Sequence, residues 1–297
     1  MGWIKSLRTV GMHLRLGQGP GVVQSLLRRG FRGATGRQTV HDFDGNLTVE
    51  LDLAEHMQRR IFWMGYYNLR LVALLNRVLA PGMVVVDVGA NIGEVSLVCA
   101  NRVGATGRVI AFEPVETIAE EFQRNVLRNG LGSVIHLCRQ GLADKAGHFS
   151  IYGSCGQFDT DESNRGLGSL HGNPARDPVL GVVEVVRLDD VIGRMGLERL
   201  DVLKIDIEGG ELACLKGALV TLERFRPIVV VEVQEHSASN AGYRGRDILD
   251  LLLPFGYQFH RLEANGQLVP ISVNDLTDYQ DVVCMPGADL AAAPRGT

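Results

Sequence analysis

The densest group of ionisable side chains in this 297-residue chain lies at 204–211, which reads Lys-Ile-Asp-Ile-Glu-Gly-Gly-Glu. The apolar residues just before it predict a buried strand that begins at residue 200 and ends at Asp206. Alternation along a strand places Lys204 and Asp206 on the same side. Carboxylates there can take a proton from a substrate hydroxyl, so Asp206, Glu208 and Lys204 are catalytic candidates. A purely structural ion pair is an equal alternative for the lysine and the final glutamate.

More charged side chains follow the next predicted strand, at 227–233, where Glu232 lies near the end and His236 comes shortly after. In open α/β sheets ligands bind at the carboxyl ends of the strands, so we expect Asp206 and Glu232 to meet there. Two carboxylates form a partial shell for Mg²⁺, and such a cation would acidify a bound hydroxyl. Asp206 and Glu232 are therefore metal-ligand candidates, and His236 is an alternative general base.

A nucleoside-binding pattern precedes these charges. Residues 84–93 read Val-Val-Val-Asp-Val-Gly-Ala-Asn-Ile-Gly, which predicts a buried strand, a tight loop and the start of a helix. The glycines allow a sharp turn and let a ligand approach the main chain. A second predicted strand, 108–112, ends at Glu113, whose carboxylate can accept hydrogen bonds from both hydroxyls of a ribose.

The loop also discriminates between cofactors. A dinucleotide fingerprint requires Gly-x-Gly-x-x-Gly, whereas here Asn91 takes the place of the glycine that approaches the pyrophosphate. Asp87, two residues before Gly89, would face a cation better than a phosphate. S-adenosylmethionine carries an ammonium, a sulfonium and a ribose but no phosphate, so it is the predicted cofactor. The alternatives are an NAD(P)-dependent oxidoreductase, a binding module without turnover, and a loop that holds no ligand.

The elements that must position these residues predict one α/β domain with a mostly parallel sheet, because strands and helices alternate along the chain. An Asp-Gly turn within 40–51 predicts a hairpin upstream, and Gly, Ser, Asn, Asp and Pro predict a long loop at 152–180 that covers the site. The predicted strands are 84–88, 108–112, 134–138, 182–186, 200–206, 227–233, 257–262 and 280–285, and the predicted helices are 55–63, 67–79, 92–103, 117–128, 211–222 and 246–253.

The chain divides into a basic arm at 1–38, a hairpin with helices at 39–80, a catalytic domain at 81–286 and a flexible tail at 287–297. No apolar run approaches the ~20 residues of a membrane span. The cysteines lack metal or disulfide spacing, which favours a cytoplasmic location. Residues 1–41 hold seven Lys and Arg and no acid, so the arm is expected to contact anionic lipid at the inner membrane face, or to form a solvated appendage or a homodimer contact. No nucleic-acid partner is expected.

Several segments taken together resemble the FkbM methyltransferases over roughly residues 43–236. They are 84–93, Ala-Phe-Glu-Pro at 111–114, Asn125 and Asn129, Leu-Ala-Asp at 142–144, and 204–211. Asn164–Leu170 is similar to the family's Asn-x-Gly-x-x-Ser stretch, while Gly65–Asn68 departs from the family pattern, in which an acid follows the aromatic residue.

The resemblance implies a class I S-adenosylmethionine-dependent fold: a seven-stranded, mostly parallel sheet with the last strand antiparallel. Helices are expected on both faces of the sheet, and the length of the chain leaves room for an N-terminal helical and hairpin extension. It implies O-methylation of a hydroxyl on a small-molecule, sugar, glycan, glycolipid or natural-product acceptor. By this similarity the loop holds the methionine end, Glu113 holds the ribose and Asp144 lies near the adenine. The loop residues expected to contact the cofactor are Asp87, Gly89, Ala90, Asn91 and Gly93.

Overall fold

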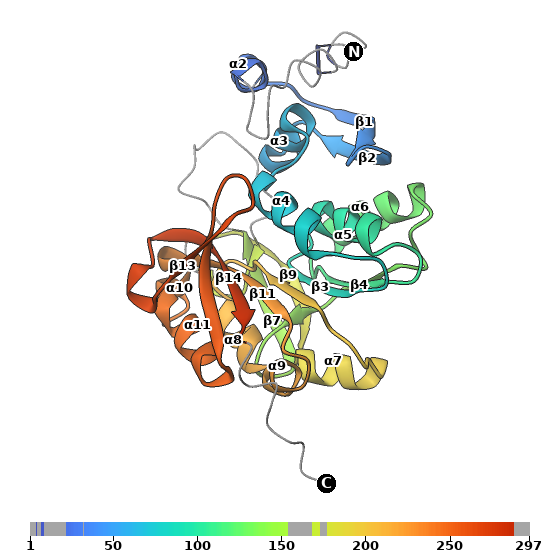
Figure 1. Cartoon of the computed structure of the whole chain (residues 1–297). Coiled ribbons are helices and arrows are strands. Elements are labelled where there is room, and N and C mark those ends of the chain that lie inside the picture. Colours follow the sequence, from blue (N-terminus) through green and yellow to red (C-terminus); the bar gives the residue numbers. More distant parts are fainter. Residues whose placement is uncertain are drawn as a thin grey trace.

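The computed structural model describes residues 4, 7–8, 22–31, 33–153, 168–172 and 177–287, and a single large sheet forms its centre (Figure 1). The strands of this sheet are β3 (Val84–Val88), β4 (Arg108–Phe112), β5 (Ile135–Cys138), β10 (Val202–Ile205), β11 (Ile228–Gln234), β12 (Tyr257–Leu262), β13 (Leu268–Ile271) and β14 (Tyr279–Pro286). Their order is β13-β12-β14-β11-β10-β3-β4-β5. The strands from β11 to β5 run parallel, and β14 runs antiparallel between β11 and β12. The predicted α/β class and the antiparallel last strand are therefore confirmed.

Seven of the eight predicted strands lie in the central sheet, which also has a further strand, β13, that the prediction missed. This strand pairs antiparallel with β12 and forms one edge of the sheet. It contains Pro270, which cannot donate a main-chain hydrogen bond and which interrupts the apolar pattern. Proline within a sheet is tolerated at edge strands, which explains both the missed prediction and the position of β13.

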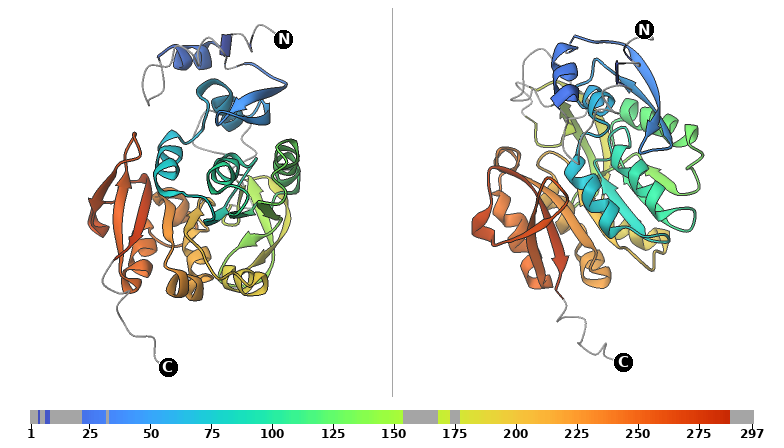
Figure 2. Two further views of the ribbon diagram at one scale, coloured as in Figure 1. Left: turned by 45° about the vertical axis from the view of Figure 1, so that its right-hand side comes forward. Right: turned by 45° about the horizontal axis from the view of Figure 1, so that its top comes forward.

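Helices cover both faces of the sheet and create two apolar cores (Figure 2). The first core includes side chains of α3 (His56–Met64), α4 (Leu69–Val78), α5 (Glu94–Val103) and α6 (Glu116–Arg128). The second includes side chains of α7 (Leu188–Met195), α8 (Glu211–Lys216), α9 (Leu219–Phe225) and α11 (Gly245–Leu252). Alternation along the strands divides their side chains between the cores, so Val85 of β3 enters the first core and Val86 the second.

The single helix predicted over 211–222 is wrong, because the structure has two helices, α8 and α9, with Gly217 and Ala218 between them. A Cβ atom on Gly217 would lie 2.2 Å from the carbonyl oxygen of Ala143. The glycine therefore allows the main chain near Ala143 to approach the end of α8, and the sequence pattern carries no sign of this distant contact.

A second, smaller sheet replaces part of the predicted loop at 152–180. It consists of β6 (Gly141–Leu142), β7 (Gly147–Gly153), β8 (Gly168–Ser169) and β9 (Val179–Val186), in the order β6-β9-β7-β8. The strand predicted at 182–186 is the second half of β9. Residues 154–167 and 173–176, which hold most of the predicted cover and Asn164 of the family-like stretch, lie outside the described residues.

The N-terminal part contributes α2 (Val22–Gly30) and the predicted hairpin, formed by β1 (Arg37–Phe43) and β2 (Leu47–Asp52). Arg8 of the basic arm is buried: its side chain donates hydrogen bonds to the carbonyl oxygen of Phe62 at 2.8 Å and to Asp42 at 2.7 Å. This arginine therefore packs against the protein itself and does not face a lipid surface. Among the described residues, no helix has the length and apolar character needed to cross a membrane.

Asn125 of α6 connects the hairpin to the glycine loop. Its side-chain oxygen accepts a hydrogen bond from the main-chain nitrogen of Glu50 at 3.0 Å, and its amide nitrogen donates to the carbonyl oxygen of Ile92 at 3.3 Å. Asn129 accepts from Thr48 N and donates to Thr48 O. Both asparagines therefore hold β2 against α6.

Replacing Asn125 with alanine is expected to lower the free energy of unfolding by about 1–3 kcal/mol, since main-chain groups of β2 and the loop lose their partner in a buried place. Urea denaturation followed by circular dichroism measures this change. Glu120→Ala on the exposed face of the same helix is the control and should change stability by less than about 0.5 kcal/mol. Equal effects of the two substitutions would contradict the bridging role of Asn125.

Candidate active site

A pocket lies at the carboxyl ends of the parallel strands, where the sequence places its candidate residues. Gly89, Ala90 and Asn91 form one part of its wall, and Glu113 follows β4 beside them. Lys204, Asp206, Glu208 and Glu232 line the pocket at the ends of β10 and β11. The pocket therefore brings together most of the residues that were predicted from strand ends and from the loop.

The glycine loop packs directly against the end of β10. Gly89 has φ +75° and a Cβ atom there would lie 1.9 Å from the carbonyl oxygen of Asp206, so only glycine fits. Gly93 has φ +93° and contacts the ring of Phe122, where a Cβ atom would lie 2.1 Å away. Gly89 therefore shapes the pocket wall, whereas Gly93 positions α5 and does not line the pocket.

Lys204 is buried, with 5% of its surface exposed, and uses its ammonium group to hold the glycine loop. Its Nζ donates to the carbonyl oxygens of Val88 at 3.2 Å and Gly89 at 2.9 Å, and lies 3.2 Å from Asp87 Oδ1. Burial alone would lower the pKa of Lys204, but Asp87 and Asp206 raise it above its usual range. The amine stays charged, donates two hydrogen bonds to the loop and forms an ion pair with Asp87, so its geometry suits positioning better than proton transfer.

Asp87 is fully buried behind the loop and does not line the pocket. Its second oxygen accepts a hydrogen bond from Ser96 Oγ at 2.6 Å, and its first oxygen faces Lys204. These contacts place Asp87 beneath the loop, where it supports the loop through the lysine.

Two buried glutamates lie on the loop side of the pocket. Glu113 accepts hydrogen bonds from Asn91 N at 3.0 Å and Val115 N at 2.9 Å, and burial raises its pKa to about 7. Burial also raises the pKa of Glu94 to about 7, and this carboxylate accepts a hydrogen bond from Tyr67 N. The sequence prediction missed Glu94, although an acid directly after a loop glycine at a helix start was an available signal.

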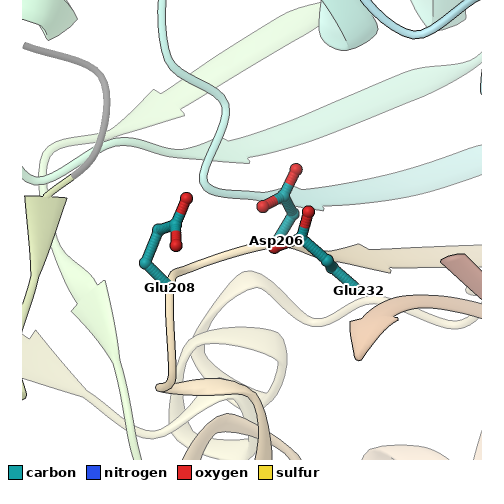
Figure 3. A group of neighbouring side chains, drawn as sticks. All are labelled: Asp206, Glu208 and Glu232. Atoms are coloured by element: carbon teal, nitrogen blue, oxygen red, sulfur yellow. The ribbon is translucent and has the colours of Figure 1, made fainter. Parts of the chain in front are cut away.

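Three carboxylates, from Asp206, Glu208 and Glu232, point into one space (Figure 3). Each contributes an oxygen, and these oxygens lie within 4.8 Å of one another. Burial, followed by the charges of Asp206 and Glu211, raises the pKa of Glu208 to about 8, and burial with Asp206 raises that of Glu232 well above its usual value. Such a cluster can share protons or hold a divalent cation. The predicted pair of Asp206 and Glu232 is thus extended by Glu208.

A sharp turn aims Glu208 at its neighbours. Glu208 has φ +53°, which is unusual for a residue with a side chain, and Gly209 follows with φ +99°. Glu211 holds this turn, because its carboxylate accepts hydrogen bonds from Ile207 N and Gly209 N, both at 2.9 Å, and from the Tyr243 hydroxyl at 3.0 Å. Glu211 therefore has the structural role that the sequence left open.

Two predicted site residues lie outside the pocket. His236 is exposed on α10 (Glu235–Asn240), with Nε2 3.3 Å from Asn240 Nδ2. Asp144 is exposed after β6, whereas the preceding residues Gln140, Gly141 and Leu142 line the pocket. Tyr279 lines the pocket without having been predicted. Its position depends on the pairing of β14 with β11, which a local pattern does not reveal.

This chain is similar to known proteins over the region that contains most of the pocket residues. Residues 87–259 match the methyltransferase FkbM domain. The AMB antimetabolite synthetase AmbE of Pseudomonas aeruginosa is 30% identical over 61% of this chain. The 31-O-demethyl-FK506 methyltransferase FkbM of Streptomyces tacrolimicus is 32% identical over 47%, and the hexuronic acid methyltransferase AglP of Haloferax volcanii is 28% identical over 56%.

The matched segments span 10%, 60% and 59% of the lengths of these three relatives. The match to the family domain itself covers more than half of this chain and includes the glycine loop, Glu113 and the three clustered carboxylates. The chain therefore belongs to the FkbM methyltransferase family.

Proposed function

We propose that this chain is an S-adenosylmethionine-dependent O-methyltransferase that acts on a hydroxyl of a sugar, a glycan, a glycolipid or a natural product. The observation that supports this most directly is one pocket in which the glycine loop and Glu113 face a cluster of three carboxylates. The loop side suits a nucleoside donor, and the carboxylate side suits activation of a hydroxyl. When bound, the donor supplies a methyl group on a positively charged sulfur.

The lining of the loop side fits this donor. Glu113 offers a carboxylate for the ribose, and Val115, Ile118 and Leu142 offer apolar surface for an adenine ring. Among the described lining residues Lys204 is the one basic side chain, and its contacts are already made. The pocket therefore favours a cationic ligand over a phosphorylated one, which argues against the NAD(P)-dependent alternative.

On the carboxylate side, Glu208 is the proposed general base. A group whose pKa lies near the working pH is the most effective base, and the raised pKa of Glu208 meets this condition. In the proposed reaction the hydroxyl oxygen forms a bond to the methyl carbon, the carbon–sulfur bond breaks with its electrons remaining on sulfur, and Glu208 takes the hydroxyl proton. Lys204 keeps the loop fixed during this step, because alignment of donor and acceptor accounts for much of the acceleration.

The acceptor class is proposed from the chemistry of the pocket together with the relatives. The Streptomyces relative is a 31-O-demethyl-FK506 methyltransferase, and the Haloferax relative is a hexuronic acid methyltransferase. Both names refer to hydroxyl-bearing compounds, which are the kind of acceptor a carboxylate base requires. A divalent cation held by Asp206, Glu232 and Glu208 is a second way to acidify the hydroxyl, supported by the spacing of their oxygens.

Donor binding should strengthen with pH because of Glu113. Its ionised carboxylate accepts hydrogen bonds from ribose hydroxyls, and with a pKa of about 7 it gains this form between pH 6 and pH 8. Calorimetry is expected to show a donor Kd that falls as the pH rises through this interval. Glu113→Gln should weaken binding by about 10–100-fold at pH 8 and flatten the slope, since a charge-assisted hydrogen bond is worth about 1.5–3 kcal/mol.

Glu120→Gln is the matched control for this experiment, because it removes the same charge from an exposed position on α6. It should leave both the donor Kd and its pH dependence unchanged. A Glu113→Gln variant with the affinity of the unaltered chain would exclude the proposed ribose contact.

Glu208→Gln is expected to lower kcat by about 10²–10⁴-fold, which is the usual contribution of a general base. At saturating donor, the unaltered chain should show kcat rising with pH to a plateau above the pKa of Glu208, and the variant should lose this rise. Release of S-adenosylhomocysteine, with an acceptor found by a donor-depletion screen, measures both. His236→Ala should stay within about twofold of the unaltered chain, because His236 lies outside the pocket. If His236→Ala lost turnover and Glu208→Gln did not, His236 and not Glu208 would be the general base.

Asp206→Asn should lower turnover much more than donor affinity, since Asp206 lies in the carboxylate cluster and not on the ribose side. The same assay, repeated after dialysis against a chelator and after addition of Mg²⁺, separates the two roles of the cluster. Activity that disappears with the chelator and returns with Mg²⁺ supports a bound cation, whereas unchanged activity leaves Glu208 as the base without a metal. Equal losses of turnover and donor affinity would reassign Asp206 to holding the donor.

A further inference from the structure

Ser169 connects the small sheet to the turn that carries Glu208. It lies in β8, where it pairs with Tyr152 of β7, and its hydroxyl donates a hydrogen bond to the main-chain carbonyl oxygen of Glu208 at 2.7 Å. The same hydroxyl oxygen accepts a hydrogen bond from His171 N at 3.1 Å. Because the His171 nitrogen occupies the acceptor side of the hydroxyl, the proton of Ser169 is directed toward Glu208.

The turn at Glu208 needs such support, since a left-handed backbone at a residue with a side chain persists only where its surroundings hold it. Glu211 holds the nitrogen atoms on both sides of Glu208, those of Ile207 and Gly209. The carbonyl group of Glu208 is held by Ser169. Glu211 accepts hydrogen bonds from two main-chain nitrogens of the turn, and Ser169 donates one to a main-chain oxygen. The two residues thus hold different atoms of the same turn.

The neighbours of Ser169 belong to the same pocket. Gly168 and Leu170 both line it, together with Glu208. A Cβ atom at Gly168 would lie 2.9 Å from Ile151 Cδ1, so β8 packs closely on β7 at this point. The small sheet therefore fixes the position of Ser169. Through the hydrogen bond from Ser169 to Glu208, it also restrains the turn.

We propose that Ser169 is a positioning residue that holds Glu208 in the left-handed conformation and so directs its carboxyl group into the pocket. This inference rests on the proposed function for its kinetic consequence, because Glu208 is the base there. Ser169 contacts no reacting atom and acts through Glu208. Segment 168–172 thereby becomes part of the catalytic apparatus as well as part of the pocket wall.

A double-mutant cycle tests this coupling. Ser169→Ala is expected to lower kcat by about 10-fold, to leave the donor Kd within about threefold, and to have no further effect in a Glu208→Gln background. Ser169→Thr keeps the hydroxyl and should restore most of the lost turnover. Ser150→Ala, a serine substitution in β7 of the same sheet, is the control and should leave kcat unchanged. An equal loss from Ser169→Ala in both backgrounds would overturn the proposal.

Crystal structures of the unaltered chain and of Ser169→Ala give a readout that does not depend on turnover. Release of Glu208 from positive φ, or rotation of its carboxyl group out of the pocket, is the expected change, while an unchanged turn in the variant overturns the proposal. Absence of donor binding and turnover in the unaltered chain would refute the proposed function, and the comparison of the two structures would still decide the role of Ser169. If Ser169→Ala is too unstable to crystallise, Ser169→Cys, which keeps only a weak donor, provides the same comparison.

Discussion

The contacts of the Lys204 ammonium group fix the relation between the two halves of the site. A charge that is almost wholly removed from water requires a partner for each of its protons. Lys204 donates hydrogen bonds to the carbonyl oxygens of Val88 and Gly89 and forms an ion pair with Asp87, all on the neighbouring strand or its loop. The glycine loop is thereby attached to the strand that carries Asp206. Any movement of the donor side relative to the carboxylate cluster would break these contacts, so the buried lysine keeps the two sides in register.

Once Lys204 is used in this way, the other ionisable side chains that line the pocket are mostly carboxyl groups. Glu94, Glu113, Glu208 and Glu232 all have raised pKa values, and burial is the largest cause for each. A fold that only needed stability would replace such groups with apolar ones. Their retention in one pocket is the pattern found at functional sites, where burial and like charges tune proton affinity. The excess of acid also distinguishes a cationic donor from a phosphorylated cofactor.

Much of this arrangement was predictable, because it depends on local patterns. Runs of β-branched residues predicted the central strands, and the rule that ligands bind at carboxyl ends of strands brought Glu113, Asp206 and Glu232 together. The small sheet was not predictable, since β7 and β9 pair across more than twenty intervening residues and β8 is only two residues long. Whether His236 and Asp144 line the pocket or are exposed to solvent depends on the geometry of the turn after each strand, which residue types alone do not determine.

Strand register gives the charged residues a role in specifying the fold as well as the site. Lys204 is paired with Asp87 on one side and with Val230 on the other, while its neighbours Leu203 and Ile205 enter the second apolar core. A shift of β10 by one residue would turn Lys204 toward that core and a leucine toward Asp87. Either result would leave a buried charge without its partner, which costs far more than exposing an apolar side chain. The ion pair that holds the glycine loop therefore also excludes the competing register of the central strand.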